Sequence, residues 1–410
     1  MAHQTLLVTV SGHDKPGVTR ALFAAMARFP VTVLDVEQLV VRGHLILTVL
    51  VGFDDDSGLP QELRTAVRQA AAALDMDVAT VIGAEEDADR RRNRVHVTIL
   101  GAPLRPAAVA ALAQEVADRG GNIDRIRRIA SYPVTAIVFE GSGADVHDLR
   151  RALASAAAAY QVDVAVQEAG LDRRGQHLVV MDVDSTLIQD EVIDLLAEVA
   201  GSSEEVARIT ERAMAGELDF AASLVERVGL LRGLDVGAID EVRGRITLTP
   251  GARTLCRTLN NLGYRLCLVS GGFIEVIGPL ASELGVSGVR ANSLEIIDGA
   301  LSGRVIGPII DRAGKRAALQ EFAAQFGIPM RRTIAIGDGA NDIDMLEAAG
   351  LGVAFNAKAP ARRAADTSVS VPYLDSVLYL LGITREDIEG ADARDGLVTP
   401  APPVRDPHEG

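Results

Sequence analysis

Apolar and polar residues follow one repeating order over the first 168 residues of the chain. Four segments carry apolar side chains at every second position, the spacing of half-buried strands. They are residues 5–11, 31–41, 44–53 and 77–83. In residues 16–28 and 59–74 the apolar side chains recur three and four positions apart, as they do in helices. The pattern predicts the order strand, helix, strand, strand, helix, strand.

A second copy of this pattern follows the first. Leu6–Gly12 (LLVTVSG) resembles Val95–Gly101 (VHVTILG), and the triplet at 77–79 resembles that at 163–165. Such an internal repeat, with this element order, predicts two ferredoxin-like βαββαβ domains. We expect them to span residues 1–85 and 93–168.

The pattern changes after a charged connector at residues 172–175. Short apolar strands now alternate with helices, which predicts a doubly wound, Rossmann-like α/β domain over residues 176–384, with ligand chemistry at the carboxyl ends of its strands. These strands are expected at 177–181, 265–269, 333–336 and 350–355. A helical insert at about 192–246 could form a cap over that edge. A hairpin is expected to turn at Asp298–Gly299. Residues 385–410, rich in proline and acidic residues, are expected to form a flexible tail.

Composition restricts the class of partner. The chain has 410 residues, and 41 Lys and Arg against 56 Asp and Glu give a net charge of -15. An acidic surface repels nucleic acid and anionic membranes, so neither is expected as a partner. Only Cys256 and Cys267 occur, too few for a disulfide framework. We therefore expect a cytoplasmic protein.

Acidic residues follow the first strand of the predicted α/β domain. Asp182 and Asp184 stand two residues apart, so strand alternation would place them on one side. Carboxylates so close repel each other unless a cation lies between them or one holds a proton. The pair could instead only cap the next helix. A calcium-binding loop is excluded because Leu187 and Ile193 stand where glycine and glutamate are required.

Further polar residues follow the other strands. Ser270–Gly272 offers a hydroxyl and backbone N–H groups suited to phosphate oxygens. Gly337–Asp342 (GDGAND) brings more carboxylates to the same edge, and oxygen ligands suit a hard cation such as Mg²⁺. Lys315, ahead of an apolar helix, could add positive charge there.

Together these motifs resemble those of the haloacid dehalogenase superfamily of phosphotransferases, and within it the phosphoserine phosphatase family. The motifs are DxDST at 182–186, SGG at 270–272, a lysine at 315 and GDGAND at 337–342, in the family's order. The resemblance implies that Asp182 is the nucleophile, forming an aspartyl-phosphate, and that Asp184 is the general acid and base. It also implies Mg²⁺ bound by Asp182, Asp338 and the backbone carbonyl of Asp184, with Asp342 orienting the water around the metal.

The resemblance also implies a set of residues that bind O-phospho-L-serine. They are Glu191, Met214, Phe220, Arg227, Ser270, Gly271, Gly272, Lys315 and Asn341. Glu191 would pair with the substrate ammonium, and Arg227 would bind its carboxylate. Considered alone, Glu191 and Arg227 could form a surface salt bridge, and Met214 and Phe220 could belong to the core of the cap.

The loop at Gly12–Gly17 resembles the ligand-binding loop of ACT domains, which bind amino acids. Glycine lets a backbone approach a small ligand, and N–H groups at a helix start can receive a carboxylate. We expect serine or another amino acid to bind at Gly12, Asp14 and Gly17, and in the second copy at Gly101 and Asn122. The second loop is longer and lacks the aspartate, and a tight turn without a ligand is the alternative for both copies.

The paired copies resemble the tandem ACT domains of long actinobacterial phosphoserine phosphatases. The resemblance implies a homodimer formed through these domains. It also implies hydrolysis of O-phospho-L-serine to L-serine, the last step of serine biosynthesis, under amino-acid control. One alternative is a related phosphatase or phosphotransferase acting on another small phosphate monoester or a phosphoprotein. The other is a non-enzymatic amino-acid sensor, which the intact set Asp182, Asp184, Lys315 and Asp338 disfavours.

Overall fold

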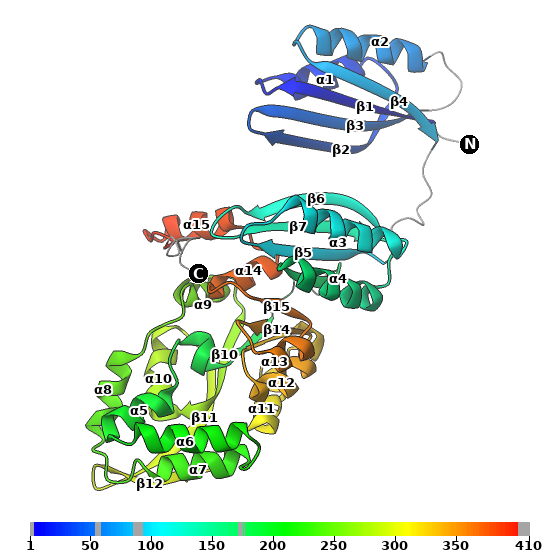
Figure 1. The fold of residues 1–410 in the computed structure, drawn as a ribbon. Coiled ribbons are helices and arrows are strands. Elements are labelled where there is room, and N and C mark those ends of the chain that lie inside the picture. The colour runs from blue at the N-terminus through cyan, green and yellow to red at the C-terminus, as the bar shows by residue number, and fades with distance from the viewer. Residues whose placement is uncertain (1–3, 54–58, 85–92, 171–174, 176, 401–410) are drawn as a thin grey trace. The chain divides into compact units, whose positions relative to one another are not determined.

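The computed structural model describes residues 4–53, 59–84, 93–170, 175 and 177–400 (Figure 1). The chain divides into two compact units, residues 1–90 and 91–410. The second ferredoxin-like copy therefore belongs to the same unit as the α/β domain.

The first unit is a four-stranded antiparallel sheet with two helices on one face (Figure 1). Its elements are β1 (Gln4–His13), α1 (Val18–Met26), β2 (Thr32–Val41), β3 (His44–Phe53), α2 (Leu59–Ala72) and β4 (Asp77–Ala84). The alternate residues Leu6, Val8 and Val10 of β1 are buried in one core with residues of the helices. This confirms the predicted ferredoxin-like element order.

The opposite face of this first sheet carries exposed apolar side chains. Leu39 is 58% exposed and is paired with Ile46, which is 40% exposed. On β4, Val81 is 60% exposed. The face of the sheet away from the helices is thus apolar, with nothing from its own unit covering it.

The second copy repeats this fold, with strand order β6-β7-β5-β8. Its elements are β5 (Val95–Gly101), α3 (Pro106–Asp118), β6 (Asn122–Ala130), β7 (Thr135–Ser142), α4 (Val146–Tyr160) and β8 (Asp163–Glu168). Val97 and Ile99 of β5 form one buried cluster with residues of the two helices, such as Leu112 of α3. The second ferredoxin-like fold is therefore also confirmed.

Unlike the first copy, the second buries the other face of its sheet as well. Leu100, Ala136, Val138 and Ala165 are at most 1% exposed and belong to the same continuous cluster as the core of the α/β domain. The second copy and the α/β domain thus share one hydrophobic interior.

Polar contacts of Asp163 join the edges of the two sheets. At the start of β8, Asp163 accepts hydrogen bonds from the Ser370 backbone N–H (2.7 Å) and from the hydroxyls of Ser368 (3.0 Å) and Ser370 (2.8 Å). Next to it, Arg150 forms an ion pair with Asp366 at 2.9 Å. These contacts align β8 with the neighbouring edge strand of the α/β domain.

The α/β domain is built on a seven-stranded sheet of order β12-β11-β10-β9-β13-β14-β15. The strands are β9 (Leu178–Met181), β10 (Arg265–Phe273), β11 (Gly288–Ile297), β12 (Ala300–Ile306), β13 (Thr333–Gly337), β14 (Leu351–Phe355) and β15 (Thr367–Val369). All neighbouring strands pair in parallel except β12, which is antiparallel to β11. The hairpin between β11 and β12 turns at Asp298–Gly299 with positive φ angles of 52° and 79°. The predicted doubly wound sheet and its hairpin are confirmed.

Helices pack on this sheet, and four more form the insert after β9. Those of the sheet are α9 (Ala252–Asn261), α10 (Ile274–Glu283), α11 (Arg312–Phe326), α12 (Ile343–Ala348), α13 (Ala359–Ala364) and α14 (Val377–Leu380). Those of the insert, the predicted cap, are α5 (Val192–Ala200), α6 (Ser203–Met214), α7 (Phe220–Gly229) and α8 (Gly237–Arg245). The two connections of the cap lie side by side, because Gln189 N donates to Thr247 O at 2.9 Å.

The expected flexible tail from residue 385 is wrong for its first part. Residues Arg385–Arg394 form helix α15, which begins with a capping box of Thr384 and Asp387. Its Asp392 binds the guanidinium of Arg257 at 2.6 and 2.8 Å, and its Ile388 is 1% exposed. Acidic residues that suggested disorder thus have partners: Asp392 pairs with Arg257 of another segment, and Glu389 pairs with Arg385 of the same helix. Residues 401–410 lie outside the described residues.

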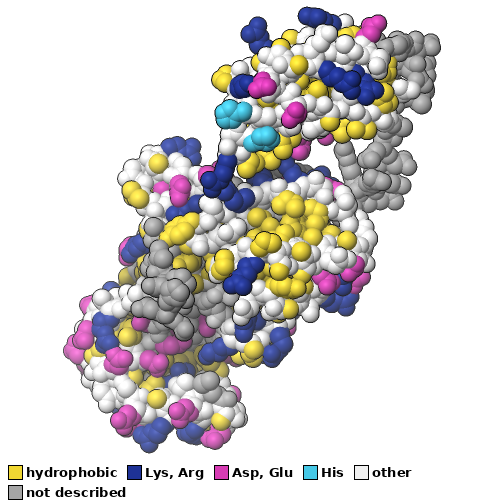
Figure 2. Space-filling model, turned by 45° about the horizontal axis from the view of Figure 1, so that its top comes forward, with side chains coloured by type: hydrophobic (Ala, Val, Ile, Leu, Met, Phe, Trp, Pro, Cys, Tyr) yellow, Lys and Arg dark blue, Asp and Glu magenta, His cyan; other side chains and the backbone are white. Residues whose placement is uncertain are grey.

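Surface charge and helix length are relevant to nucleic acid and membranes, which the sequence does not favour as partners. Figure 2 shows Lys and Arg side chains interspersed with Asp and Glu over the face that it presents. Among the described residues, no helix has the length and apolar character needed to cross a bilayer.

Candidate active site

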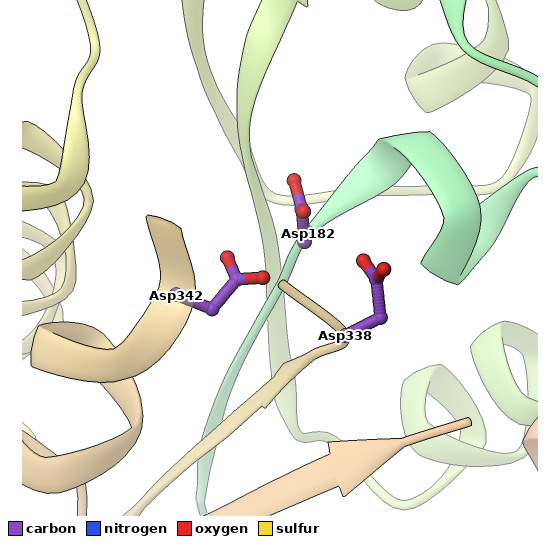
Figure 3. Close-up of side chains that lie close together, drawn as sticks. All are labelled: Asp182, Asp338 and Asp342. Carbon is purple, nitrogen blue, oxygen red and sulfur yellow. The ribbon is translucent and has the colours of Figure 1, made fainter. Parts of the chain in front are cut away.

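Three carboxylates meet at the carboxyl edge of the α/β sheet (Figure 3). Asp182 directly follows β9, while Asp338 and Asp342 follow β13. One oxygen of each lies within 4.8 Å of the others. Burial and the charge of Asp342 raise the pKa of Asp182 well above its usual value, and burial raises the pKa of Asp338 to about 6. A divalent cation would relieve this repulsion, so the oxygen donors fit a metal ion.

Lys315 supplies positive charge to the same cluster. Its Nζ atom lies 2.7 Å from Asp182 Oδ1 and 2.7 Å from Asp342 Oδ1, and the side chain is 1% exposed. Burial opposes the charged form, but the charges of Asp182 and Asp342 prevail and raise the pKa of Lys315 above its usual value. The ammonium therefore stays protonated beside Asp182.

The second aspartate of the DxDST motif points to a different set of partners. Asp184 Oδ1 accepts a hydrogen bond from Val192 N at 2.9 Å, and Oδ2 accepts one from Ser270 Oγ at 3.0 Å. Burial raises the pKa of Asp184. A carboxyl with a raised pKa, two residues from Asp182, suits the transfer of a proton at this edge.

Ser270–Gly272 are an irregular part of β10 beside Asp184, which we call the Ser270–Gly272 loop. Ser270 Oγ accepts a hydrogen bond from Gly272 N at 2.7 Å. A Cβ atom at Gly271 would lie 2.9 Å from Phe220 Cζ, and one at Gly272 would lie 3.0 Å from Asp184 Oδ2. Glycine at these two positions lets Phe220 and Asp184 approach the backbone closely.

The cap brings further predicted residues to the site. Glu191 precedes α5 and accepts a hydrogen bond from Ser185 Oγ at 3.0 Å. Its side chain is exposed to solvent, but desolvation by the surrounding protein and the charge of Asp184 raise the pKa of Glu191 to about 7. Arg227, on α7, donates a hydrogen bond to Ser223 O at 3.3 Å. Partial burial lowers the pKa of Arg227, although the charges of Asp194 and Glu191 act to raise it. Met214 is the last residue of α6, and its side chain is outside the described residues.

The residues predicted to bind an amino-acid effector lie at strand ends and in the turn that precedes α1. Gly17 caps α1 with a φ angle of 98°, and a Cβ atom at Gly12 would lie 2.7 Å from Met76 Sδ. Asp14 N donates to Gly43 O at 2.8 Å. In the second copy, a Cβ atom at Gly101 would lie 2.9 Å from Leu104 Cα, and the Asn122 amide donates to Asp124 at 2.7 Å. These contacts explain the glycines without a ligand, so effector binding stays a prediction.

Two residues at the site escaped the sequence analysis. Thr186 donates to Asp338 Oδ1 at 3.3 Å, and its position inside the DxDST motif could have drawn attention to it. Asn292 on β11 donates to Gly271 O at 2.7 Å. No local pattern marks Asn292, because its partner is distant in the sequence.

Comparison with known proteins identifies each part of the chain. Residues 179–347 match the haloacid dehalogenase-like hydrolase family, and residues 4–80 and 95–167 each match an ACT domain family. The phosphoserine phosphatase of Streptomyces coelicolor is 55% identical, over 95% of this chain and 94% of that protein. The phosphoserine phosphatase SerB2 of Mycobacterium tuberculosis is 51% identical, over 96% and 97%.

A solved structure is also similar. The probable phosphoserine phosphatase of Vibrio cholerae is 32% identical, with a TM-score of 0.56, over 74% of this chain and 90% of that one. Similarity over nearly the full length of two phosphoserine phosphatases, together with the three domain matches, leads to one assignment. The chain belongs to the phosphoserine phosphatases of the haloacid dehalogenase superfamily, in the form that carries two ACT domains ahead of the catalytic domain.

Proposed function

We propose that Asp182 is the nucleophile with which this phosphoserine phosphatase hydrolyses O-phospho-L-serine. The observation that carries the proposal is the buried Asp182 carboxylate, which lies 2.7 Å from the Lys315 ammonium at the carboxyl edge of the sheet. A carboxylate oxygen attacks phosphorus and the phosphorus–oxygen bond to serine breaks, which leaves an aspartyl-phosphate. Asp184 gives its proton to the departing serine oxygen.

The second step regenerates the enzyme. Asp184, now ionised, takes a proton from a water molecule, whose oxygen bonds to phosphorus while the bond to Asp182 breaks. Phosphate and free Asp182 result. Ser270, the N–H groups of the Gly271 and Gly272 loop, Lys315 and Asn341 would hold the phosphoryl oxygens while negative charge shifts among them.

We infer that the metal is Mg²⁺. Asp182 and Asp338 would bind it through their side chains and Asp184 through its backbone carbonyl, while Asp342 orients the water around it. The grouping of Asp182, Asp338 and Asp342, all oxygen donors, supports a hard divalent cation. When bound, such an ion neutralises charge on the phosphoryl group.

Recognition of the serine part is proposed for the cap. Glu191 would pair with the ammonium and Arg227 with the carboxylate, and Met214 and Phe220 would form the apolar wall. The pKa of about 7 for Glu191 supports this role, because an incoming ammonium would favour its ionised form. Phe220 lies against Gly271, so the wall adjoins the phosphate loop.

We propose that serine or another amino acid binds the ACT domains and alters catalysis. The contact between β8 and β15 offers a physical route, because Asp163 bonds directly to Ser368 and Ser370. β15 neighbours β14, and β14 neighbours β13, which Asp338 directly follows. A shift of β8 can therefore reach the catalytic edge through the sheet.

A homodimer through the ACT domains is also proposed. The first ACT sheet exposes Leu39, Val41 and Val81 at 58%, 55% and 60% on the face away from its helices. Apolar sheet faces of this kind are commonly covered by a partner. A second copy of the same face would bury these side chains.

The proposed domain limits follow the sequence. We place the ACT domains at 1–85 and 93–168, the phosphatase domain at 176–384 and its cap at 192–246. Both cysteines are free and buried, which supports the proposal of a reducing, cytoplasmic environment.

Removing divalent metal tests the proposed cofactor. Treatment with EDTA should abolish phosphate release from phosphoserine, and added Mg²⁺ should restore it. Asp338→Asn should raise the Mg²⁺ concentration for half-maximal activity by about tenfold to a hundredfold, because a ligand charge is lost. Asp344→Asn is the matched control, since Asp344 pairs with Arg312 outside the cluster. Full activity in metal-free buffer would contradict the assignment.

Replacement of Arg227 tests the recognised substrate. Arg227→Ala should lower kcat/KM for phosphoserine by about a hundredfold, because the substrate carboxylate loses a charged partner. Activity on p-nitrophenyl phosphate, which lacks this carboxylate, should change little. Arg232→Ala, an exposed arginine of the same cap, is the control. Equal losses on both substrates, or unchanged phosphoserine turnover, would favour another phosphate monoester.

A titration with L-serine tests the effector site. Serine should change the rate of the unmodified enzyme, and Gly17→Ala should raise the concentration needed by about tenfold, because a side chain strains this left-handed position. Gly263→Ala, at a similar φ of 74° in the catalytic domain, controls for backbone strain. An unaltered serine response in Gly17→Ala would argue against binding at this loop.

Sedimentation equilibrium tests the dimer. The 43.2 kDa chain should sediment at twice that mass, and Leu39→Glu should convert it to a monomer, because a charge would be buried between the sheets. Ile297→Glu, at an exposed apolar residue of the catalytic hairpin, should leave the dimer intact. A monomeric unmodified chain, or a dimeric Leu39→Glu variant, would refute this arrangement.

A further inference from the structure

Asn292 is a buried polar residue to which the mechanism above gives no role. It lies on β11 and is 1% exposed. Its Nδ2 atom donates to Gly271 O at 2.7 Å, and its Oδ1 atom accepts from Ile310 N at 2.8 Å. A single amide thus connects the phosphate loop to the segment that leads into α11.

A break in the strand pairing explains why the first bond is needed. The parallel pairing of β10 with β11 runs as far as Val269 with Arg290 and resumes only at Phe273 with Asn292. Between these pairs the Ser270–Gly272 loop leaves the ladder. A buried carbonyl without a partner is costly, and Asn292 supplies the donor that the Gly271 carbonyl needs.

This bond orients a whole peptide group. Gly271 O and Gly272 N belong to the same planar peptide. At one side Asn292 holds the oxygen, and at the other Gly272 N donates to Ser270 Oγ at 2.7 Å. Ser270 Oγ in turn donates to Asp184 Oδ2 at 3.0 Å. Asn292 therefore determines the direction of the Ser270 hydroxyl through the peptide between them.

The second bond acts on the opposite side of the site. Ile310 precedes Asp311, whose side chain caps α11 by accepting from Gly314 N at 2.8 Å. In the first turns of that helix, Lys315 reaches Asp182 and Asp342 at 2.7 Å. The Asn292 amide thus holds the start of α11 at a set distance from the phosphate loop.

We propose that Asn292 is a positioning residue for the phosphoryl group. It keeps the donors of the Ser270–Gly272 loop and of Lys315 at the spacing at which both reach the same phosphoryl oxygens. The residue touches no substrate itself and acts through these two segments. The inference rests on the proposed function, because it takes these groups as the ones that hold the phosphoryl oxygens.

Two variants separate this role from general support of the fold. Asn292→Ala removes both bonds, and Asn292→Asp keeps the shape but sets a carboxylate against the Gly271 carbonyl. Both should lower kcat/KM for phosphoserine and for p-nitrophenyl phosphate by a similar factor, about tenfold to a hundredfold. The preference between the two substrates should not change, because the cap is untouched.

The binding of inorganic phosphate, measured by calorimetry with Mg²⁺ present, gives a readout independent of turnover. The dissociation constant of phosphate should rise by about tenfold in both variants. If Asn292→Ala does not fold, the same rise is expected in Asn292→Asp. Asn260→Ala is the matched control, since the Asn260 amide donates to the carbonyl of Leu284 at 3.1 Å away from the site.

Two outcomes would overturn the proposal. One is unchanged phosphate binding in folded Asn292 variants. The other is an equal loss of binding in Asn260→Ala, which would indicate general destabilisation. An unmodified enzyme that binds phosphate but does not hydrolyse phosphoserine would instead refute the proposed function, and the phosphate measurement would still decide the role of Asn292.

Discussion

The buried ion pairs of Lys315 make the rest of the catalytic site possible. Asp182, Asp338 and Asp342 crowd one edge of the sheet, and burial raises the pKa of Asp182 and of Asp338. The Lys315 ammonium, 2.7 Å from two of these carboxylates, offsets part of that charge within the protein itself. A bound metal ion would neutralise the remaining negative charge of the three carboxylates. Lys315 lies in the first turns of α11 and is buried, so its position depends on how that helix begins. The Asp311 cap of α11 and the segments next to it therefore affect the site as well.

Much of the fold and of the site could be predicted from sequence, for a physical reason. The spacing of apolar residues that marks a strand or a helix is a local feature of the sequence. In a doubly wound sheet the carboxyl ends of parallel strands meet at one edge, so the proximity of Asp182, Ser270 and Asp338 could be predicted. Contacts between distant segments leave no such signal. Helix α15 looked disordered because its partner Arg257 is far away in the chain, and Asn292 looked like any polar residue of a strand.

The two ACT copies show how one element pattern serves two environments. In each copy, alternate residues of the strands face the helices and form a hydrophobic core with them. The other face is exposed in the first copy, with Leu39 and Val81, and buried in the second, with Ala136 and Val138. Both faces are apolar, so hydrophobic pattern alone does not distinguish a face that meets the catalytic domain from one left open in its own unit.

The interior that the second copy shares with the catalytic domain has an evolutionary consequence. Leu100, Val138 and Ala165 are shielded by the catalytic domain, and that domain is shielded by them in return. A gene that lost only the second copy would encode a phosphatase whose apolar residues at this interface are exposed to solvent. Ser368 and Ser370 would also lose their hydrogen bonds to Asp163. The core of the first copy, by contrast, is a separate cluster of its own residues. Once this shared interior had formed, the second copy and the catalytic domain could be inherited only as one piece.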